Sequence, residues 1–186
     1  MSNPFFTIGH STRPIEEFVA LLKSAEVELV VDVRTVPRSR TNPQFNRDAL
    51  PASLAAHGIA YEHLAALGGL RGKQLGVNSD VNAFWANASF HNYADYAMSE
   101  GFRTGLRNLR ELGRSARPAV MCAESLWWRC HRRIIADYLI AAGEEVFHIL
   151  GLGHIEPARL TPEARVEPDG RLIYPKDTQL MVDLRP

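Results

Sequence analysis

The segment around the two cysteines holds the densest group of residues that could carry out chemistry. Cys122 is followed two residues later by Glu124, and Cys130 is followed directly by His131 and Arg132. A cysteine between a strand end and a helix start can have a lowered pKa, because the helix amides favour the thiolate. Such thiolates are nucleophiles in sulfur transfer and phosphoester hydrolysis. The segment therefore points to a thiol-containing site.

The same cysteines admit two other interpretations. Cys122, Cys130 and His131, with His10 as a fourth ligand, could bind a metal ion, although the spacing of the cysteines is not that of a C-x-x-C knuckle. Cys122 could also be a small buried residue of the core. The spacing alone leaves nucleophile, metal ligand and packing residue open.

Two other groups of polar residues follow apolar runs earlier in the chain. His10 and Ser11 follow the first run, and Asp32 and Arg34 lie at the end of the second. Carboxylates and histidines in different environments can act as the general acid and the general base of one reaction. Arginine binds phosphate or carboxylate groups with two hydrogen bonds. Two structural alternatives remain open: Asp32 could pair with Arg34, and His10 could donate to a backbone carbonyl.

Apolar runs and helical spacing predict alternating strands and helices. Strands are expected at 5–9, 27–33, 59–63, 119–122 and 145–150, and helices at 15–22, 50–57, 93–98, 102–112 and 128–142. This order predicts an α/β fold with three layers: a mostly parallel sheet with helices on both faces.

The predicted α/β domain covers residues 1–155, and residues 156–186 form a C-terminal tail packed on the same domain. A Pro-Asp-Gly turn at 168–170 predicts a small hairpin in this tail. Ligands of such sheets bind beyond the carboxyl ends of the strands. We therefore expect the three polar groups to meet at one edge, and the glycine-rich segment 67–76 to close over the substrate.

Length and composition narrow the class of protein. The chain has 186 residues, 46% of them hydrophobic, which suits a single globular domain. Its net charge of +0 argues against a general nucleic-acid coat protein. No apolar run approaches the roughly 18 residues of a membrane span, and the N-terminus lacks the pattern of a signal peptide. We therefore expect a cytoplasmic protein that does not associate with membranes.

Several motifs, taken in order, resemble a known prokaryotic family, "domain of unknown function 488". The resemblance covers about residues 5–151 and is carried by Thr7-Ile-Gly-His-Ser11, Asp32-Val-Arg34, Leu67-Gly-Gly69, Cys122-Ala-Glu124 and Cys130-His-Arg132. It implies a cytoplasmic α/β domain and no particular reaction.

A looser similarity is to rhodanese-like domains, in which a strand also ends in Asp-Val-Arg and a later one in cysteine. The sequence departs from that pattern at Glu124, because a carboxylate beside an anion site repels a thiolate or a phosphate. This departure favours a hydrolytic or transfer reaction that uses Glu124 over sulfur transfer.

The favoured hypothesis is a hydrolase or transferase that acts on a phosphorylated or nucleotide-like small molecule. Glu124, Asp32 and His10 would supply acid–base chemistry, and Cys122 would be a nucleophile or a packing residue. The anionic group of the substrate would be held by Ser11, Arg34, Cys130, His131 and Arg132.

Three alternatives remain, and the sequence names no cofactor and no oligomeric state. One is a non-catalytic module that binds a nucleotide or, less favoured, a nucleic acid through two arginine-rich segments, 34–47 and 129–133. Its bases would stack on Phe45, Trp85, Phe90 or Tyr93. A second is a rhodanese-like or phosphatase-like enzyme that uses Cys122 as its thiol. The third is metal-dependent chemistry.

Overall fold

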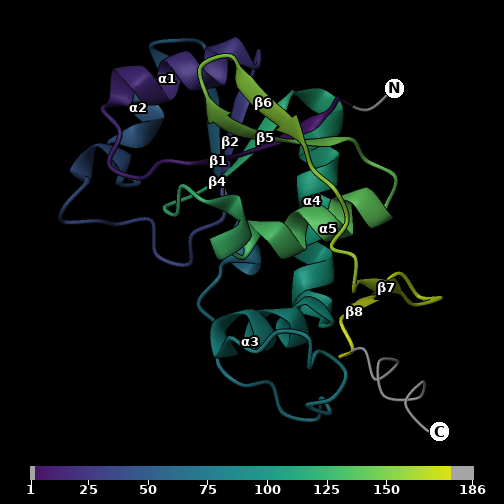
Figure 1. Ribbon diagram of the computed structural model, residues 1–186. Helices are drawn as coiled ribbons and strands as arrows, with labels where there is room; N and C mark the ends of the chain where they lie inside the picture. Colours follow the sequence, from purple (N-terminus) through teal and green to yellow (C-terminus); the bar gives the residue numbers. More distant parts are fainter. Residues whose placement is uncertain (1–2, 177–186) are drawn as a thin grey trace, which may run out of the picture.

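A computed structural model describes residues 3–176 of the chain. Its centre is a six-stranded sheet with the order β3-β2-β4-β1-β5-β6 (Figure 1). The strands are β1 (Phe5–Gly9), β2 (Leu29–Asp32), β3 (Ala60–His63), β4 (Pro118–Cys122), β5 (Val146–Gly151) and β6 (His154–Pro157). The first five are parallel, and β6 runs antiparallel to β5. The predicted α/β fold with a mostly parallel sheet is confirmed.

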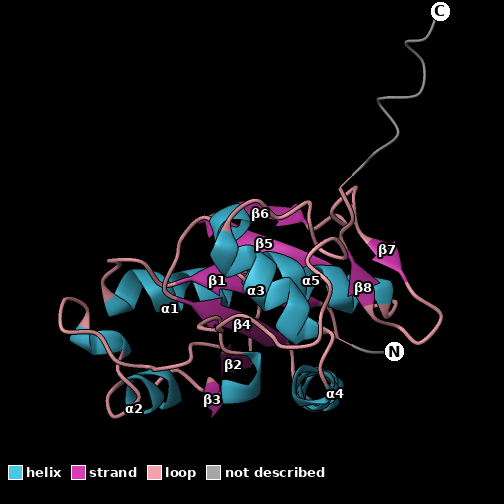
Figure 2. Ribbon diagram, turned by 90° about the horizontal axis from the view of Figure 1, so that it is seen from below, coloured by secondary structure: helices cyan, strands magenta, loops and turns pink. Residues whose placement is uncertain are grey.

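Helices cover both faces of the sheet (Figure 2). The helices α1 (Ile15–Ser24) and α2 (Leu50–Ala55) pack on one face, and α4 (Glu100–Ser115) and α5 (Arg132–Ala141) pack on the other. The strand residues alternate between the two cores, so β1 sends Phe5 to one face and Phe6 to the other. Because both faces are buried, the central strands are continuously apolar in sequence.

The remaining helix, α3 (Ala88–Ala97), lies beside the C-terminal hairpin of β7 (Arg165–Val166) and β8 (Leu172–Ile173) (Figure 1). Asn87 caps α3 by accepting a hydrogen bond of 2.9 Å from the amide of Ser89, so the helix begins earlier than the predicted residue 93. The predicted hairpin is confirmed. Leu172 and Tyr174 from this part of the chain are buried in the same core as α5.

Two elements differ from the sequence prediction. The strand β6 was not predicted, because its residues are mostly exposed and lack an apolar run; the boundary expected after residue 155 falls inside it. The helix expected from residue 128 begins at Arg132 and follows a 3₁₀ turn, η3 (Trp127–Arg129). The amide of Cys130 donates to the carbonyl of Trp127 at 3.2 Å, which closes that turn. Cys130 therefore lies at a bend between two helical segments.

Strand register brings the predicted functional residues to one edge of the sheet. Gly9 of β1 is paired with Cys122 of β4, and Asp32 of β2 is paired with Met121 of β4 and His63 of β3. The loop after β4 passes directly over Gly9, where a Cβ atom would overlap the carbonyl group of Glu124. No helix in residues 3–176 is both long and apolar enough to cross a membrane.

Candidate functional site

A cavity of about 670 Å³ opens beyond the carboxyl ends of β1, β2 and β4. Of the residues that the sequence analysis proposed for the site, those that line it are His10, Ser11, Arg34, Cys122, Glu124, Cys130 and His131. The other two, Asp32 and Arg132, are buried next to the cavity and do not line it. The sheet therefore gathers these segments at one edge.

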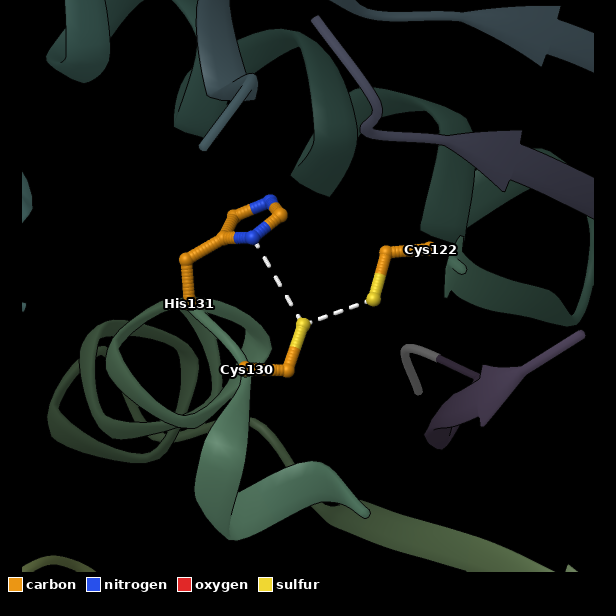
Figure 3. A group of neighbouring side chains, drawn as sticks. All are labelled: Cys122, Cys130 and His131. Carbon is orange, nitrogen blue, oxygen red and sulfur yellow. Dashed lines mark hydrogen bonds between the residues drawn. The ribbon is translucent and has the colours of Figure 1, made fainter. Parts of the chain in front are cut away.

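The two cysteines meet at this cavity. Cys122 ends β4, Cys130 precedes α5, and their sulfur atoms are 2.6 Å apart (Figure 3). Both side chains are buried among the apolar residues on one face of the sheet, with exposed fractions of 3% and 5%. Because both cysteines line the cavity, a small molecule in the cavity can reach either sulfur.

His131 faces the sulfur of Cys130 (Figure 3). Its Nε2 atom lies 3.1 Å from the carbonyl oxygen of Val33, and because a carbonyl only accepts, Nε2 carries the proton of the neutral ring. The other ring nitrogen, Nδ1, lies 3.5 Å from the Cys130 sulfur and is left to accept a proton from it. The ring of Tyr93 packs against the imidazole, and a Cβ atom at Gly69 would overlap it. These contacts fix the orientation of His131.

Arg132 lies behind the thiols, with a side chain only 1% exposed. Its Nε atom is 3.4 Å from the Cys130 sulfur, and its other nitrogens donate to the carbonyl of Glu124 and the hydroxyl of Thr7. No carboxylate in residues 3–176 forms an ion pair with it. A buried cation requires a compensating negative charge, and the neighbouring Cys130 sulfur can provide it as a thiolate.

The pKa values of the two thiols move in opposite directions. Burial tends to raise the pKa of Cys130, but the hydrogen bond from Cys122, the contact with His131 and the charge of Arg132 together lower it well below its ordinary value. Burial, followed by the hydrogen bond with Cys130, raises the pKa of Cys122 well above its ordinary value. Both shifts favour the proton on Cys122 over the proton on Cys130.

Cys122, Cys130 and His131 also form the group of described residues that could hold a metal ion, with donor atoms all within 4.8 Å of one another. Two thiolates bound to one tetrahedral zinc ion stand about 3.8 Å apart, farther than the 2.6 Å between these sulfurs. His10, the fourth ligand considered from the sequence, is not part of this group. The two sulfurs would therefore have to move apart to bind one zinc ion.

Asp32 and Arg34 form a second cluster at the same edge. Two nitrogens of Arg34 donate to the two carboxylate oxygens of Asp32 at 2.9 and 2.6 Å, and the hydroxyl of Tyr61 donates to one of them at 2.7 Å. Burial and this hydrogen bond raise the pKa of Tyr61 above its ordinary value. Asp32 is fully buried, and both its oxygens are in use. This arrangement is the structural ion pair left open by the sequence.

His10 belongs to this second cluster. Its Nδ1 atom donates to the carbonyl of Ser11 at 2.8 Å, its Nε2 atom accepts from Arg34 at 3.3 Å, and its ring stacks on Phe45. Burial, together with the positive charge of Arg34, lowers the pKa of His10 to about 4. At neutral pH the ring is therefore uncharged, with both nitrogens in hydrogen bonds.

Ser11 and Glu124 form the wall between the two clusters. Ser11 has a φ of 50°, in the left-handed region that few residues other than glycine adopt, and its amide donates to the carbonyl of Ala123 at 2.9 Å. The carboxylate of Glu124 accepts a hydrogen bond of 3.0 Å from the amide of Leu126, two residues later. Glu124 provides the one carboxylate among the described residues that line the cavity.

The cavity is also lined by residues outside the set favoured for the site in the sequence analysis. Arg38 and Arg129 line the cavity and are exposed, and neither side chain has a hydrogen-bond or ion-pair partner in residues 3–176. Val36, Leu70 and Phe90 form an apolar part of its lining. Both arginines lie in arginine-rich segments, and this is the feature of the sequence that could have identified them. The sequence does not show that the two segments line the same cavity.

Comparison with protein families matches residues 14–139 to the Domain of unknown function DUF488. The match includes Asp32, Arg34, both cysteines and Arg132, and it begins after His10 and Ser11. No curated protein and no solved structure matches the chain, and no rhodanese-like relationship is found. Because the match spans more than half of the sequence, the chain belongs to the DUF488 family.

Proposed function

We propose that this protein is a thiol-dependent enzyme in which Cys130 is the nucleophile and the substrate is a small anionic molecule. The observation that carries the proposal is the position of the Cys130 sulfur. It lies next to the cavity, within 3.5 Å of Nδ1 of His131 and Nε of Arg132, and it accepts a hydrogen bond from Cys122.

The roles of the surrounding residues follow from these contacts. His131 takes the proton of Cys130, because its Nδ1 atom is the acceptor nearest the sulfur that is not bound elsewhere. Arg132 stabilises the resulting thiolate, and so does the N-terminal end of α5, which begins two residues after Cys130. Cys122 keeps its proton and donates it to the thiolate as a hydrogen bond.

Arg38 and Arg129 support the anionic substrate. Each has a guanidinium group without a described partner, and the single carboxylate of the lining, Glu124, is already hydrogen-bonded within its own loop. Arginine binds carboxylate and phosphate groups through two parallel hydrogen bonds, so these two side chains suit an anion at the cavity.

The contacts support the acid–base hypothesis less well. Asp32 is hydrogen-bonded to Arg34 and Tyr61, and His10 is neutral with both nitrogens occupied. Of the four aromatic residues considered for base stacking, Phe45, Trp85 and Tyr93 are buried in the core, whereas Phe90 is partly exposed and lines the cavity. Glu124 remains available in the lining as an acceptor for a substrate hydroxyl or amine.

The test is alkylation of the native protein across pH 5–9 with neutral iodoacetamide and with anionic iodoacetate. Each cysteine is quantified separately by peptide mass spectrometry, and each rate is divided by the rate for free cysteine. We expect Cys130 to react with a midpoint well below the ordinary thiol value of about 8.5, and Cys122 to react slowly. Equal reactivity of both cysteines with an ordinary midpoint would contradict the proposal.

The two reagents also test the substrate charge. We expect iodoacetate to be favoured over iodoacetamide, and this preference to fall about tenfold when Arg38 and Arg129 are both replaced by glutamine. The matched control is Arg159→Gln, because Arg159 is also exposed, has no described partner and lies outside the cavity. A preference that survives in the Arg38/Arg129 variant would exclude these arginines as the anion site.

A further inference from the structure

The close approach of the two sulfurs is not required for Cys130 to act as a nucleophile. A serine, a backbone amide or a water molecule would serve as the hydrogen-bond donor to a thiolate. Instead the chain places its second cysteine 2.6 Å away. The length of a disulfide bond is about 2.05 Å, so a small side-chain movement brings these atoms to bonding distance.

The backbone holds the two cysteines in this arrangement. Cys122 belongs to β4, which lies between β1 and β2 in the middle of the sheet. Cys130 is held by the 3₁₀ turn η3 and by α5, whose residues Ile134 and Ile135 are fully buried. The pair is therefore formed by a central strand and by a bend that is held between two helical segments.

We infer that Cys122 and Cys130 are the two members of a reversible dithiol–disulfide pair, and that the enzyme carries out thiol–disulfide exchange with small molecules that contain both a sulfur–sulfur bond and an anionic group. This inference rests on the proposed nucleophile, Cys130, and adds Cys122 as the thiol that resolves the covalent intermediate. The anionic group lies against Arg38 and Arg129, and the apolar part of the substrate lies against the apolar residues of the lining.

The size of the opening indicates a small molecule. Both sulfurs are almost fully buried and are reached through a cavity of about 670 Å³, within the range of small-molecule sites. The apolar lining is available to a ligand, because Leu70 and Val36 are 75% and 60% exposed. An aromatic or aliphatic disulfide that carries a carboxylate or phosphate matches this combination of charge and apolar surface.

The exchange proceeds in two balanced steps. The Cys130 thiolate attacks one sulfur of the substrate disulfide, so that a mixed disulfide forms and the other half of the substrate leaves as a thiolate. Cys122 then loses its proton to water, because His131 already holds the proton of Cys130, and attacks the Cys130 sulfur, which releases the second half. The substrate gains two electrons and the protein loses two as its internal disulfide forms. Low-molecular-weight thiols reopen that disulfide by the reverse exchange.

The test uses dithiobis-nitrobenzoate, an anionic aromatic disulfide whose released thiolate is coloured. We expect the native protein to release two coloured thiolates per chain, to retain no adduct and to become lighter by two hydrogen atoms. The chain has two cysteines, so an internal disulfide in a monomer joins Cys122 to Cys130. Dithiothreitol should then restore both thiols.

Two variants separate the inference from the proposed function. Cys122→Ser should release one coloured thiolate rapidly and keep the other half bound to Cys130, because the resolving thiol is absent. Cys130→Ser should react slowly. If the wild-type protein also keeps the adduct on Cys130, the disulfide pair is excluded while the nucleophile stands. If Cys130→Ser reacts at the wild-type rate, the proposed function itself fails. A metal ion that must be chelated before either cysteine reacts would overturn both.

Discussion

Two buried arginines at the same edge of the sheet have opposite surroundings. Arg34 follows β2 and donates two hydrogen bonds to the carboxylate of Asp32, so its charge is neutralised within its own segment. Arg132 opens α5, and its acceptors are a carbonyl oxygen, a hydroxyl and the sulfur of Cys130. We propose that the compensating negative charge next to Arg132 comes from the Cys130 thiol.

The comparison separates a structural cluster from a reactive one. Around Arg34, every polar atom named above has a partner, and replacement of any member leaves another one unpaired. Around Arg132, the proposed compensating charge is a Cys130 thiolate beside the cavity, where it can react. Residue types alone do not distinguish the clusters, since each contains an arginine and a histidine. The hydrogen-bond partners of the two arginines distinguish them.

The largest effect is expected from Arg34→Gln. This change leaves the buried carboxylate of Asp32 without a counter-charge, so the free energy of unfolding should fall by about 3–5 kcal/mol. Urea denaturation measures this loss, and the double variant Asp32→Asn/Arg34→Gln should recover part of it. A loss below about 1 kcal/mol would show that this cluster is not structural.

The structural cluster should also weaken at low pH through His10. Its pKa is about 4 in the folded protein, against 6.5 for an ordinary histidine, so the unfolded chain binds the proton more readily. The contribution of His10 to the free energy of unfolding is fully present above pH 6.5 and is lost as the pH falls towards 4. The loss is at most about 3 kcal/mol. Urea denaturation across this range should show a smaller pH dependence in His10→Gln. An unchanged dependence would indicate that folding does not lower the pKa of His10.

The reactive cluster should respond to Arg132→Gln by a change in chemistry. Removal of the positive charge raises the pKa of Cys130, and each unit of increase lowers its alkylation rate near pH 6 by about tenfold. The full pH profile is the measurement, because it distinguishes a shifted midpoint from general damage to the site. Arg132→Lys, which keeps the charge, should restore part of the shift. A midpoint that stays in place in Arg132→Gln would mean that Arg132 does not stabilise the thiolate.

The smallest effect is expected from Gly69→Ala. The added Cβ atom meets the imidazole of His131 and turns it away from Cys130, so alkylation of Cys130 near neutral pH should fall by roughly threefold to tenfold. Gly72→Ala is the matched control, because a Cβ atom there meets no other atom within 4 Å. Equal rates in the two variants would exclude Gly69 as a support for His131.

Local sequence patterns predicted the elements that end at the site. The apolar runs before His10, Asp32 and Cys122 marked three strands correctly, because a strand buried on both faces must be apolar throughout. The start of α5 was placed too early, since the 3₁₀ turn at Trp127–Arg129 has the same helical spacing of apolar residues as the helix that follows. Cys130 therefore lies in the bend that faces Cys122, and not in the helix where the sequence pattern placed it.

The sequence by itself determined the alternation of strands and helices, the family motifs and the polar residues at strand ends, because these depend on neighbours along the chain. Only the tertiary structure decided which buried arginine has a carboxylate partner, which cysteine lies beside His131 and Arg132, and that Arg38 and Arg129 line one cavity. These facts depend on the strand order, in which β4 lies between β1 and β2. The hydrophobic pattern separates central from edge strands, but it does not order the central ones, because any arrangement of β1, β2 and β4 would bury the same apolar faces.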